Sequence, residues 1–490
     1  MKTYFLNPTL SGRTPYIREG RCMQKTSSWA TPWPPITLGV LAAIAREIGP
    51  VRLVDGNVAT MSLKELLKDI SAIDPDLIVV NTGFPSIEDD MAVAAKIREN
   101  FPEAKILAFG VYFTLLGKKA LERHPQLDFG IVGEPEEVFR KFLTVLESGS
   151  RRYNQVAGLL YKDTSGIEFT VAHPYVENID QLPFPARDLF QNDHYRLPHN
   201  NKVFTLINVA RGCPYPCIYC IVPPYYGSRV RKHSVAYVME EIKECLFRYG
   251  IEEFLFWEEV FTLDRKFAFA LCEAILKNEL SIRWAATTRV GLLDQDLLRI
   301  MKRAGCYLLG LGIESGNQEI LDGAKKKQTV AEIKKAVQTC KKARIQTMGH
   351  FIFGLPGETR ETAQKTIDFM LSLGLDYMQS YCAVPYPKTE FGEMAAKHGW
   401  IRSNQWSEYD FGGHSIVDNG TITPEEVTRF REKAFRDFYF RPSYFFNHVL
   451  KNFPLKQLLK ILRFAQWMHP KKQKDREMPH GSQCCHPMSE

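Results

Sequence analysis

Short apolar runs alternate with helical patterns along most of this chain, in two successive series. In the first series, over residues 1–150, the runs are the length of strands and are bounded by turn residues. The candidate strands are Thr3–Leu6, Val51–Val54, Leu77–Val80, Lys105–Phe109 and Phe129–Val132. Such alternation is typical of a parallel sheet with helices on both faces. We therefore expect residues 1–150 to form an α/β domain with a Rossmann-like, doubly wound parallel sheet.

Helical periodicity fills the gaps between these strands. The expected helices are Ile36–Ile48, Ser62–Ile73 and Asp89–Asn100. Ser62 followed by Glu65 predicts a capping box at the start of the second helix.

Glycine and small polar residues follow four of the predicted strands. They are Asp55-Gly56-Asn57, Asn81-Thr82-Gly83, Gly110 and Gly133-Glu134. In sheets of this kind a ligand binds outside the carboxyl ends of the strands, where small residues let it approach the backbone. Ordinary turn chemistry explains any one of these groups equally well. The residues alone therefore predict a small ligand-binding α/β domain.

Residues 151–200 read as a connector that contains a hairpin, with strands Leu159–Tyr161 and Glu168–Val171. The second series then occupies residues 201–400. Its candidate strands are Val203–Val209, Glu253–Trp257, Ile282–Thr288, Tyr307–Ile313, Ile345–Phe353 and Asp376–Ala383, and its clearest helices are Val235–Arg248, Asp294–Ala304 and Val330–Ala343. About six βα units in a row suit a partial barrel, with the chemistry at the carboxyl ends of its strands.

The first strand of the second series runs into three closely spaced cysteines, Cys213, Cys217 and Cys220. Three thiolates on one short loop can hold three irons of a cubane iron–sulfur cluster and leave the fourth iron open. A zinc site would need a fourth ligand, and the nearest downstream histidine is His233. The scattered cysteines such as Cys245 lie inside apolar patterns and read as small buried hydrophobic residues.

With an aromatic residue before its last cysteine, the spacing C-x3-C-x2-C resembles the signature of the radical S-adenosylmethionine superfamily. The resemblance covers nearly all of residues 203–390. It extends to motifs that follow in family order, which are WEEVFTLD, ATTRVGLLD, GIESG, FIFGLPGET and VPYPKTE. It implies a [4Fe–4S] cluster on the three cysteines, with S-adenosylmethionine (SAM) bound to the open iron and cleaved to a 5′-deoxyadenosyl radical.

The same resemblance implies roles for individual residues around SAM. Tyr219 would lie near the adenine, Glu258 or Glu259 would meet the methionyl amine, and Glu314 and Ser315 would lie near the ribose and the amino acid. The backbone at Ile352 and Gly354 would also lie near the adenine.

The first domain resembles the cobalamin-binding domain that precedes the barrel in one branch of this superfamily, which contains methyltransferases and an anaerobic cyclase. The resemblance implies cobalamin at the strand ends, on Asp55, Gly56, Asn57, Thr82, Ser86, Gly110, Gly133 and Glu134. Two departures stand out. The histidine of a D-x-H-x-x-G motif is missing, and Tyr112 stands where relatives often carry histidine.

After Trp400 the resemblance fades into a basic C-terminal extension, residues 401–490, which we expect to be helical. Phe, Leu, Ile and Trp alternate there with Lys and Arg over residues 440–475, as in a helix that contacts an anionic membrane surface or packs on the barrel. Cys484, Cys485 and His486 are a weak metal signal. The net charge of +7 is concentrated in this tail, so no nucleic-acid partner is expected. The start of the chain shows no signal-peptide pattern, so the expected location is cytoplasmic, with possible peripheral contact at the membrane.

The resulting functional prediction is a radical SAM enzyme that uses cobalamin to methylate an unactivated carbon of a small, lipid-like substrate. An electron donor such as flavodoxin or ferredoxin would be its partner. Two alternatives stay open: a cyclase or other C–C bond-forming oxidoreductase that does not need cobalamin, and a non-catalytic iron–sulfur electron carrier or scaffold.

Overall fold

The computed structural model of the chain describes residues 1–26, 31–164, 166–172 and 175–444. It divides the chain into two compact units, residues 1–435 and 436–490. Apart from residues 440–444, the predicted membrane-contacting segment lies outside the described residues, as do Cys484, Cys485 and His486. No helix in the described part of the chain is long and apolar enough to cross a membrane.

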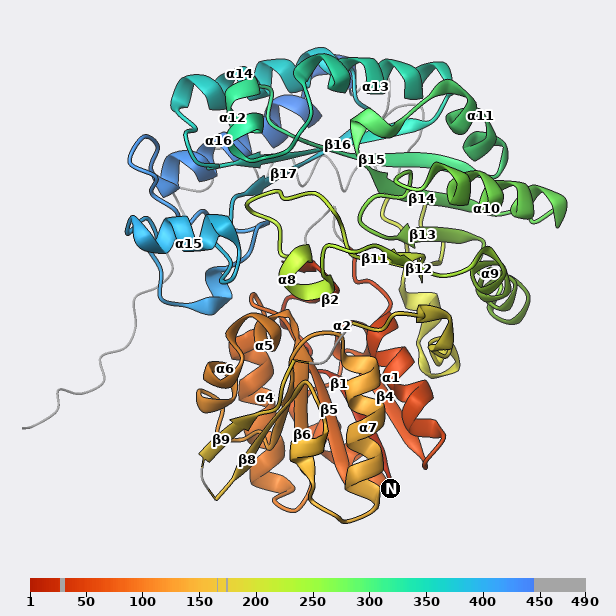
Figure 1. Cartoon of the computed structure of the whole chain (residues 1–490), viewed down its shortest axis with the longest axis vertical. Coiled ribbons are helices and arrows are strands. Elements are labelled where there is room, and N and C mark those ends of the chain that lie inside the picture. The colour runs from red at the N-terminus through yellow and green to blue at the C-terminus, as the bar shows by residue number, and fades with distance from the viewer. Residues whose placement is uncertain (27–30, 165, 173–174, 445–490) are drawn as a thin grey trace, which may run out of the picture. The chain divides into compact units, whose positions relative to one another are not determined.

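The first sheet has seven strands in the order β4-β1-β5-β6-β7-β8-β9 (Figure 1). Its five parallel strands are β1 (Thr3–Asn7), β4 (Val51–Asp55), β5 (Leu77–Thr82), β6 (Lys105–Gly110) and β7 (Phe129–Ile131). The predicted hairpin forms β8 (Leu159–Asp163) and β9 (Gly166–Phe169), which extend this sheet as antiparallel edge strands. The parallel α/β sheet expected from the sequence is therefore confirmed.

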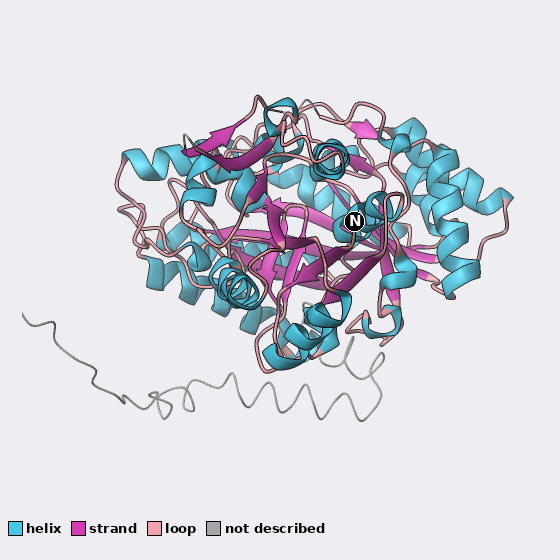
Figure 2. Cartoon of the chain, turned by 90° about the horizontal axis from the view of Figure 1, so that it is seen from below, coloured by secondary structure: helices cyan, strands magenta, loops and turns pink. Residues whose placement is uncertain are grey.

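Helices cover both faces of this sheet. Neighbouring residues of a strand point to opposite faces, so each strand contributes side chains to two cores. Phe5 packs in one core with α1 (Ile36–Arg46) and α7 (Pro135–Glu147). Tyr4 and Leu6 pack in the other. That second core contains α3 (Leu63–Ile73), α4 (Ile87–Asn100), α5 (Val111–Leu116) and α6 (Lys118–Glu122). Seen from below, helices lie on either side of the strands (Figure 2). The predicted capping box is present, since Ser62 and Glu65 bond each other's backbone amides.

A short hairpin that the sequence did not indicate lies at the carboxyl ends of these strands. Its strands are β2 (Tyr16–Glu19) and β3 (Cys22–Lys25). Arg18 on this hairpin is buried and donates to the carboxylate of Asp90 at 2.6 Å. A buried arginine must be neutralised in this way, so the hairpin is held firmly over the sheet edge.

The second sheet is parallel throughout, in the order β10-β13-β14-β15-β16-β17. Its strands are β10 (Phe204–Asn208), β13 (Glu253–Trp257), β14 (Arg283–Thr288), β15 (Cys306–Glu314), β16 (Gln346–Phe353) and β17 (Tyr377–Cys382). The connecting helices include α9 (Val235–Tyr249), α10 (Arg265–Lys277), α11 (Gln295–Arg303), α12 (Gln318–Gly323), α13 (Val330–Lys342) and α14 (Arg360–Leu373). Since β10 and β17 are the two edges, the sheet is a six-unit partial barrel, as the sequence predicted.

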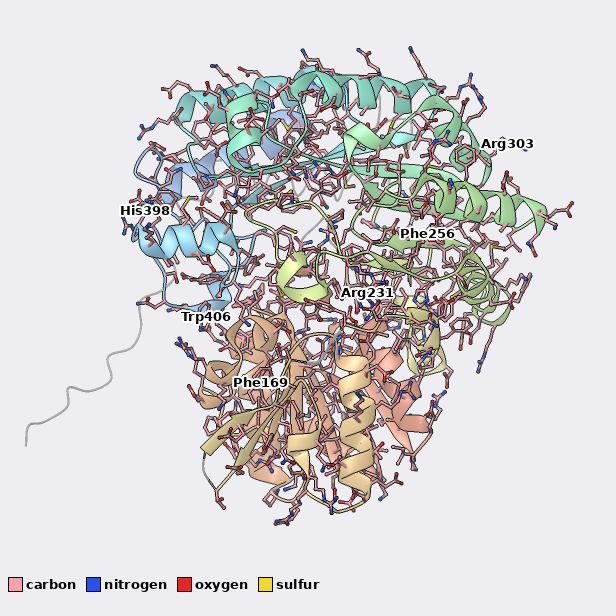
Figure 3. All side chains as sticks on the ribbon, in the orientation of Figure 1. Phe169, Arg231, Phe256, Arg303, His398 and Trp406 are labelled. Carbon is pink, nitrogen blue, oxygen red and sulfur yellow. The ribbon has the colours of Figure 1, made fainter. Side chains whose placement is uncertain are left out.

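Aromatic packing fills the outer layer of the barrel. Trp284 on β14 is fully buried, stacks on Phe256 of β13 with 4.7 Å between ring centroids, and donates its indole N–H to the carbonyl of Ala304 (Figure 3 labels Phe256). After the barrel come α15 (Glu390–Lys397), α16 (Pro424–Tyr439) and α17 (Pro442–Tyr444).

Four buried charges connect the first sheet to the barrel, and we call them the ion-pair bridge. Glu134 and Glu136, at the start of α7, pair with Arg211 and Arg231. The shortest contacts are 2.7 Å between Arg211 and Glu136 and 2.6 Å between Arg231 and Glu134. All four residues are at most 5% exposed, and Arg231 is labelled in Figure 3. The carboxylates also lie at a helix N-terminus, which favours negative charge.

Breaking the ion-pair bridge should cost more stability than breaking a surface pair. Arg231→Met removes the 2.6 Å partner of the buried Glu134 carboxylate and leaves it the 3.7 Å contact with Arg211, so we expect a loss of about 3–5 kcal/mol in unfolding free energy. The control Arg299→Met removes an exposed pair with Asp296 and should cost under about 1 kcal/mol. Urea unfolding of the full chain followed by circular dichroism measures both. Equal midpoints for the two variants would contradict the structural role of the bridge.

Candidate functional site

The three-cysteine loop starts directly beside the ion-pair bridge. Two short strands, β11 (Ala210–Arg211) and β12 (Arg231–Lys232), pair antiparallel and enclose it, together with α8 (Val222–Tyr226). Gly212 has φ of +92°, and a side chain there would place its Cβ 2.2 Å from the carbonyl oxygen of Arg229. Only glycine satisfies both conditions, so the loop leaves the strand at this residue.

Cys213, Cys217 and Cys220 are free and partly exposed on this loop, whereas Cys245 and the four later described cysteines are buried. Burial raises the pKa of the Cys220 thiol to about 12 and also raises that of Cys213. Both thiols are therefore protonated at neutral pH, and binding of iron would have to displace their protons. Half-buried thiols on a loop that begins at a glycine are better suited to bind a cluster than to pack in a core.

His233, the alternative zinc ligand, is engaged elsewhere. Its Nδ1 lies 2.9 Å from a carboxylate oxygen of Asp180, and its ring stacks on Tyr237. Among the described residues, no group of three His, Cys, Asp or Glu side chains is placed to hold a single metal ion. In a cubane each thiolate binds a different iron, so its ligands need not converge on one point.

Tyr219 lies beside a buried ion pair at the end of β15. Lys326 Nζ is 2.5 Å from Glu314 and 3.4 Å from the Tyr219 hydroxyl. Burial and the neighbouring Glu314 carboxylate raise the pKa of Tyr219 well above its usual range. Glu314 itself has φ of +66°, an uncommon conformation for a residue with a side chain. Backbone held in such a conformation is found preferentially at functional sites.

The structure separates the two candidate carboxylates after β13. Glu259 pairs with Arg21, which comes from the β2–β3 hairpin and also lies over the ring of Trp257. Glu258 is 6% exposed, and its Oε1 is buried without a hydrogen-bond partner among the described residues. Burial, and then the charge of Glu259, raise the pKa of Glu258 to about 8. A buried, unpaired carboxyl group of this kind is suited to a ligand that brings its own donor.

The remaining predicted SAM residues take two different positions. Along β16, half-buried and buried residues alternate, and Ile352 is one of the half-buried ones. Gly354 has φ of +88° and donates its amide to Glu358. Ser315, in contrast, is fully buried and bonds the hydroxyl of Thr366 on α14. Ser315 therefore holds the turn after β15.

One half of the predicted cobalamin site is closed by protein groups. Asp55 accepts hydrogen bonds from Asn7, Asn57 and the Tyr195 hydroxyl. Gly56 is also enclosed, because a side chain there would meet the backbone carbonyl of Thr9. Arg18 donates to Asn57 in the same half, and also to Ser86 beyond the end of β5. These strand ends, after β1 and β4, are thus saturated by the chain's own side chains.

The other half, after β5, β6 and β7, is more open. A side chain at Gly133 would meet nothing within 4 Å, and one at Gly83 would meet only the flexible side chain of Met23. Gly110 is packed against the backbone of Thr82. Glu134 follows Gly133 directly and belongs to the ion-pair bridge. This half therefore adjoins the residues that hold the three-cysteine loop.

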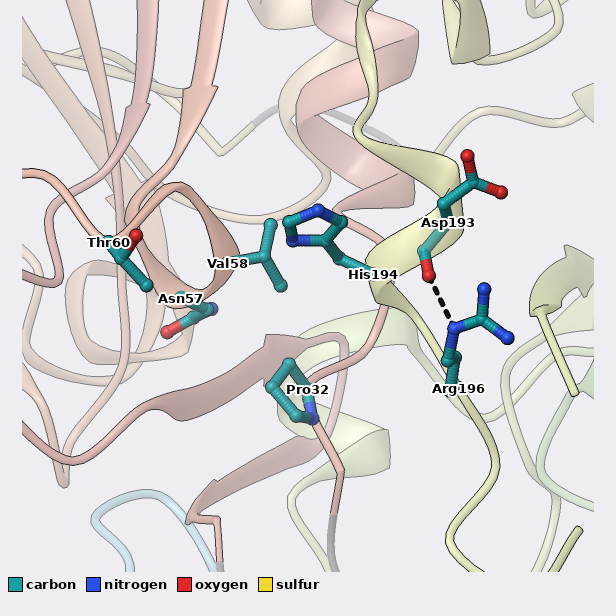
Figure 4. A pocket seen from close by; sticks show the side chains of 7 residues that line it. All are labelled: Pro32, Asn57, Val58, Thr60, Asp193, His194 and Arg196. Carbon is teal, nitrogen blue, oxygen red and sulfur yellow. Dashed lines mark hydrogen bonds between the residues drawn. The ribbon is translucent and has the colours of Figure 1, made fainter. Parts of the chain in front are cut away.

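An open hollow of about 590 Å³ lies at the edge of the closed half (Figure 4). Asn57, Thr60 and Arg196 line it, and Arg196 donates to the carbonyl of Asp193 at 2.7 Å. Of the predicted site residues, Asn57 alone lines it, so the hollow is separate from the cysteine loop.

Sequence reasoning missed three cations at this site: Arg21, Arg289 and Lys326. Arg289 follows β14 and lies 3.9 Å from Cys217 Sγ, and Arg21 reaches Glu259 from 238 residues away. Arg289 lies within the ATTRVGLLD motif, and that motif could have indicated it. No local pattern distinguishes Arg21 or Lys326 from ordinary surface cations.

Comparisons with known proteins agree with this geometry. Residues 207–370 match the family described as the Radical SAM superfamily. An uncharacterized methyltransferase of Pyrococcus horikoshii is 31% identical over 86% of this chain and 91% of its own length. The anaerobic magnesium-protoporphyrin IX monomethyl ester cyclase of Cereibacter sphaeroides is 27% identical over 84% of this chain and 68% of its own length.

The fold is also similar to that of a solved structure, the radical SAM methyltransferase TsrM of Kitasatospora setae with cobalamin and a [4Fe–4S] cluster bound. The TM-score is 0.69, with 18% identity over 90% of this chain and 89% of TsrM. The full-length relative at 31% identity and the family match together show that this chain belongs to the radical S-adenosylmethionine superfamily, whose enzymes use a [4Fe–4S] cluster and SAM.

Proposed function

We propose that this enzyme cleaves SAM at the three-cysteine loop and uses the radical to methylate an unactivated carbon of a small molecule. The observation that carries the SAM site is the buried carboxyl of Glu258, whose Oε1 has no partner among the described residues. Its neighbour in sequence, Glu259, lies close enough to Cys213 and Cys220 for its charge to act on both thiols. The relative from Pyrococcus horikoshii, which matches over nearly its full length, supports methyl transfer.

The thiolates of Cys213, Cys217 and Cys220 would hold three irons, leaving the fourth for the methionyl group of SAM. A [4Fe–4S] cluster bound there supplies the electron that cleaves the sulfonium. Glu258 would accept a hydrogen bond from the methionyl amine. Lys326, which pairs with Glu314, would attract the carboxylate of the same ligand, since it is a cation.

We infer that cobalamin binds at the open half of the strand ends, around Gly83, Gly110 and Gly133. The backbone is approachable at Gly83 and Gly133, and the residue after Gly133 is tied to the cysteine loop through Arg231. Cobalamin, when bound, supplies the methyl group. The closed half, at Asp55, would support the fold of the domain.

A cyclase or other oxidoreductase that needs no cobalamin is the second candidate. The Cereibacter sphaeroides relative favours it, and so does the saturation of Asp55, Asn57 and Ser86 by protein partners. In either case the enzyme needs a one-electron donor of the flavodoxin or ferredoxin class. A lipid-like substrate remains a prediction from the tail sequence.

The cluster assignment predicts complete loss of chemistry on removal of its ligands. Replacing Cys213, Cys217 and Cys220 together with Ala should abolish both the iron-dependent absorbance and the formation of 5′-deoxyadenosine after anaerobic reconstitution. The matched control Cys245→Ala removes a buried core thiol and should leave both intact. A full cluster in the triple variant would mean that other residues bind it.

Glu258 should matter for SAM binding and not for folding. Glu258→Gln replaces an unpaired carboxyl, so the unfolding midpoint should not fall. SAM should bind roughly ten- to a hundredfold more weakly, because a charge-assisted hydrogen bond is worth about 1.5–3 kcal/mol. Equilibrium dialysis with the cluster-loaded enzyme measures this. Unchanged affinity would remove Glu258 from the SAM site.

The cobalamin site is tested by blocking the open half. Gly133→Leu adds a side chain where a corrin would approach, so the full chain should lose hydroxocobalamin during gel filtration while keeping its iron. Gly149→Leu is the control, since Gly149 has a similar positive φ and open surroundings but lies after α7. A colourless wild-type protein that still forms 5′-deoxyadenosine would instead favour the cobalamin-independent alternative.

A further inference from the structure

Three sets of contacts hold Arg289 in place, two with the three-cysteine loop and one with the backbone of residues 326 and 327. Its guanidinium lies over the ring of Tyr215, 3.7 Å from the centroid, and its Nη1 is 3.9 Å from Cys217 Sγ. Its Nη2 donates to the carbonyls of Lys326 and Lys327. Arg289 is 6% exposed. A planar guanidinium can stack and donate at once, which an ammonium cannot do.

The three thiols differ in where their hydrogen-bond donors come from. Cys213 receives the backbone amide of Tyr215, and Cys220 receives that of Val222 at 3.4 Å. Those donors are present whatever side chains follow the cysteines. Cys217 receives a side chain, Arg289, so this one contact is set by the choice of a single residue.

Arg289 also brings a charge that no carboxylate among the described residues neutralises. The described residues contain no ion pair to Arg289, whereas the half-buried Arg21 is paired with Glu259 and the buried Lys326 with Glu314. A buried cation without a counter-charge is costly to fold. An anionic group bound at Cys217 would offset that cost.

We propose that Arg289 hydrogen-bonds the Cys217 sulfur of the bound cluster and raises the reduction potential of that cluster. The proposal rests on the proposed function, because it requires the cluster to be held by the three cysteines. Reduction adds one electron, from a flavodoxin- or ferredoxin-class donor, and therefore one negative charge to the cluster. A fixed positive charge stabilises the more negative state, and hydrogen bonds to cluster sulfurs shift the potential in the same direction.

The test is a redox titration of the anaerobically reconstituted full chain without SAM, followed by electron paramagnetic resonance. Arg289→Met keeps much of the side-chain length and removes the charge, so the midpoint potential should become more negative. Arg289→Lys keeps the charge without the stacked fork and should give an intermediate value. Arg303→Met removes an exposed arginine on α11, labelled in Figure 3, and should leave the potential unchanged.

A wild-type potential in a fully loaded Arg289→Met would overturn the proposal. So would an unchanged potential with weakened SAM binding, which would make Arg289 a SAM ligand only. If Arg289→Met takes up no iron, Arg289→Gln is compared with Arg289→Lys, and equal potentials in those two would count against the role of charge. Failure of the wild-type chain to bind a cluster would instead refute the proposed function, and iron analysis separates the two results.

Discussion

The position of the three-cysteine loop depends on the neutralisation of two buried arginines. Arg211 ends β11, two residues before Cys213, and Arg231 begins β12 at the far end of the loop. Both are neutralised by Glu134 and Glu136 from the start of α7, so the loop is closed by residues of the first sheet domain. Because an unpaired charge buried this deeply would cost several kcal/mol, neither the first sheet domain nor the barrel can shift without straining the other.

The β2–β3 hairpin is a second connection between the first sheet and the barrel. Its two arginines, Arg18 and Arg21, bind different partners. Arg18 turns toward the first sheet and donates to Thr9 and Asn57 in the closed half of its strand ends. Arg21 turns toward the barrel and pairs with Glu259, whereas the Oε1 of Glu258 has no partner in the described part of the chain. One short hairpin thus selects which carboxylate and which strand ends remain available to ligands.

The regular elements could be predicted because their signals are local. The apolar runs of both series and the Ser62–Glu65 capping box lie within a few residues of the structure they specify. The three-cysteine motif was visible for the same reason. The hairpin was missed because it is short and polar, and its arginines acquire meaning only through partners 72 and 238 residues away. Ser315 could not be assigned to the turn from sequence, because its partner Thr366 lies on a distant helix.

The central claim is that three cysteines hold a cluster whose fourth iron is open to SAM. Mössbauer spectroscopy of the full chain reconstituted with ⁵⁷Fe tests it most directly, before and after addition of SAM. The account predicts four irons, with the isomer shift of one changing when SAM binds to it through two new ligands. A spectrum that SAM leaves unchanged, in protein that binds SAM, would show that no iron is open and would contradict the account.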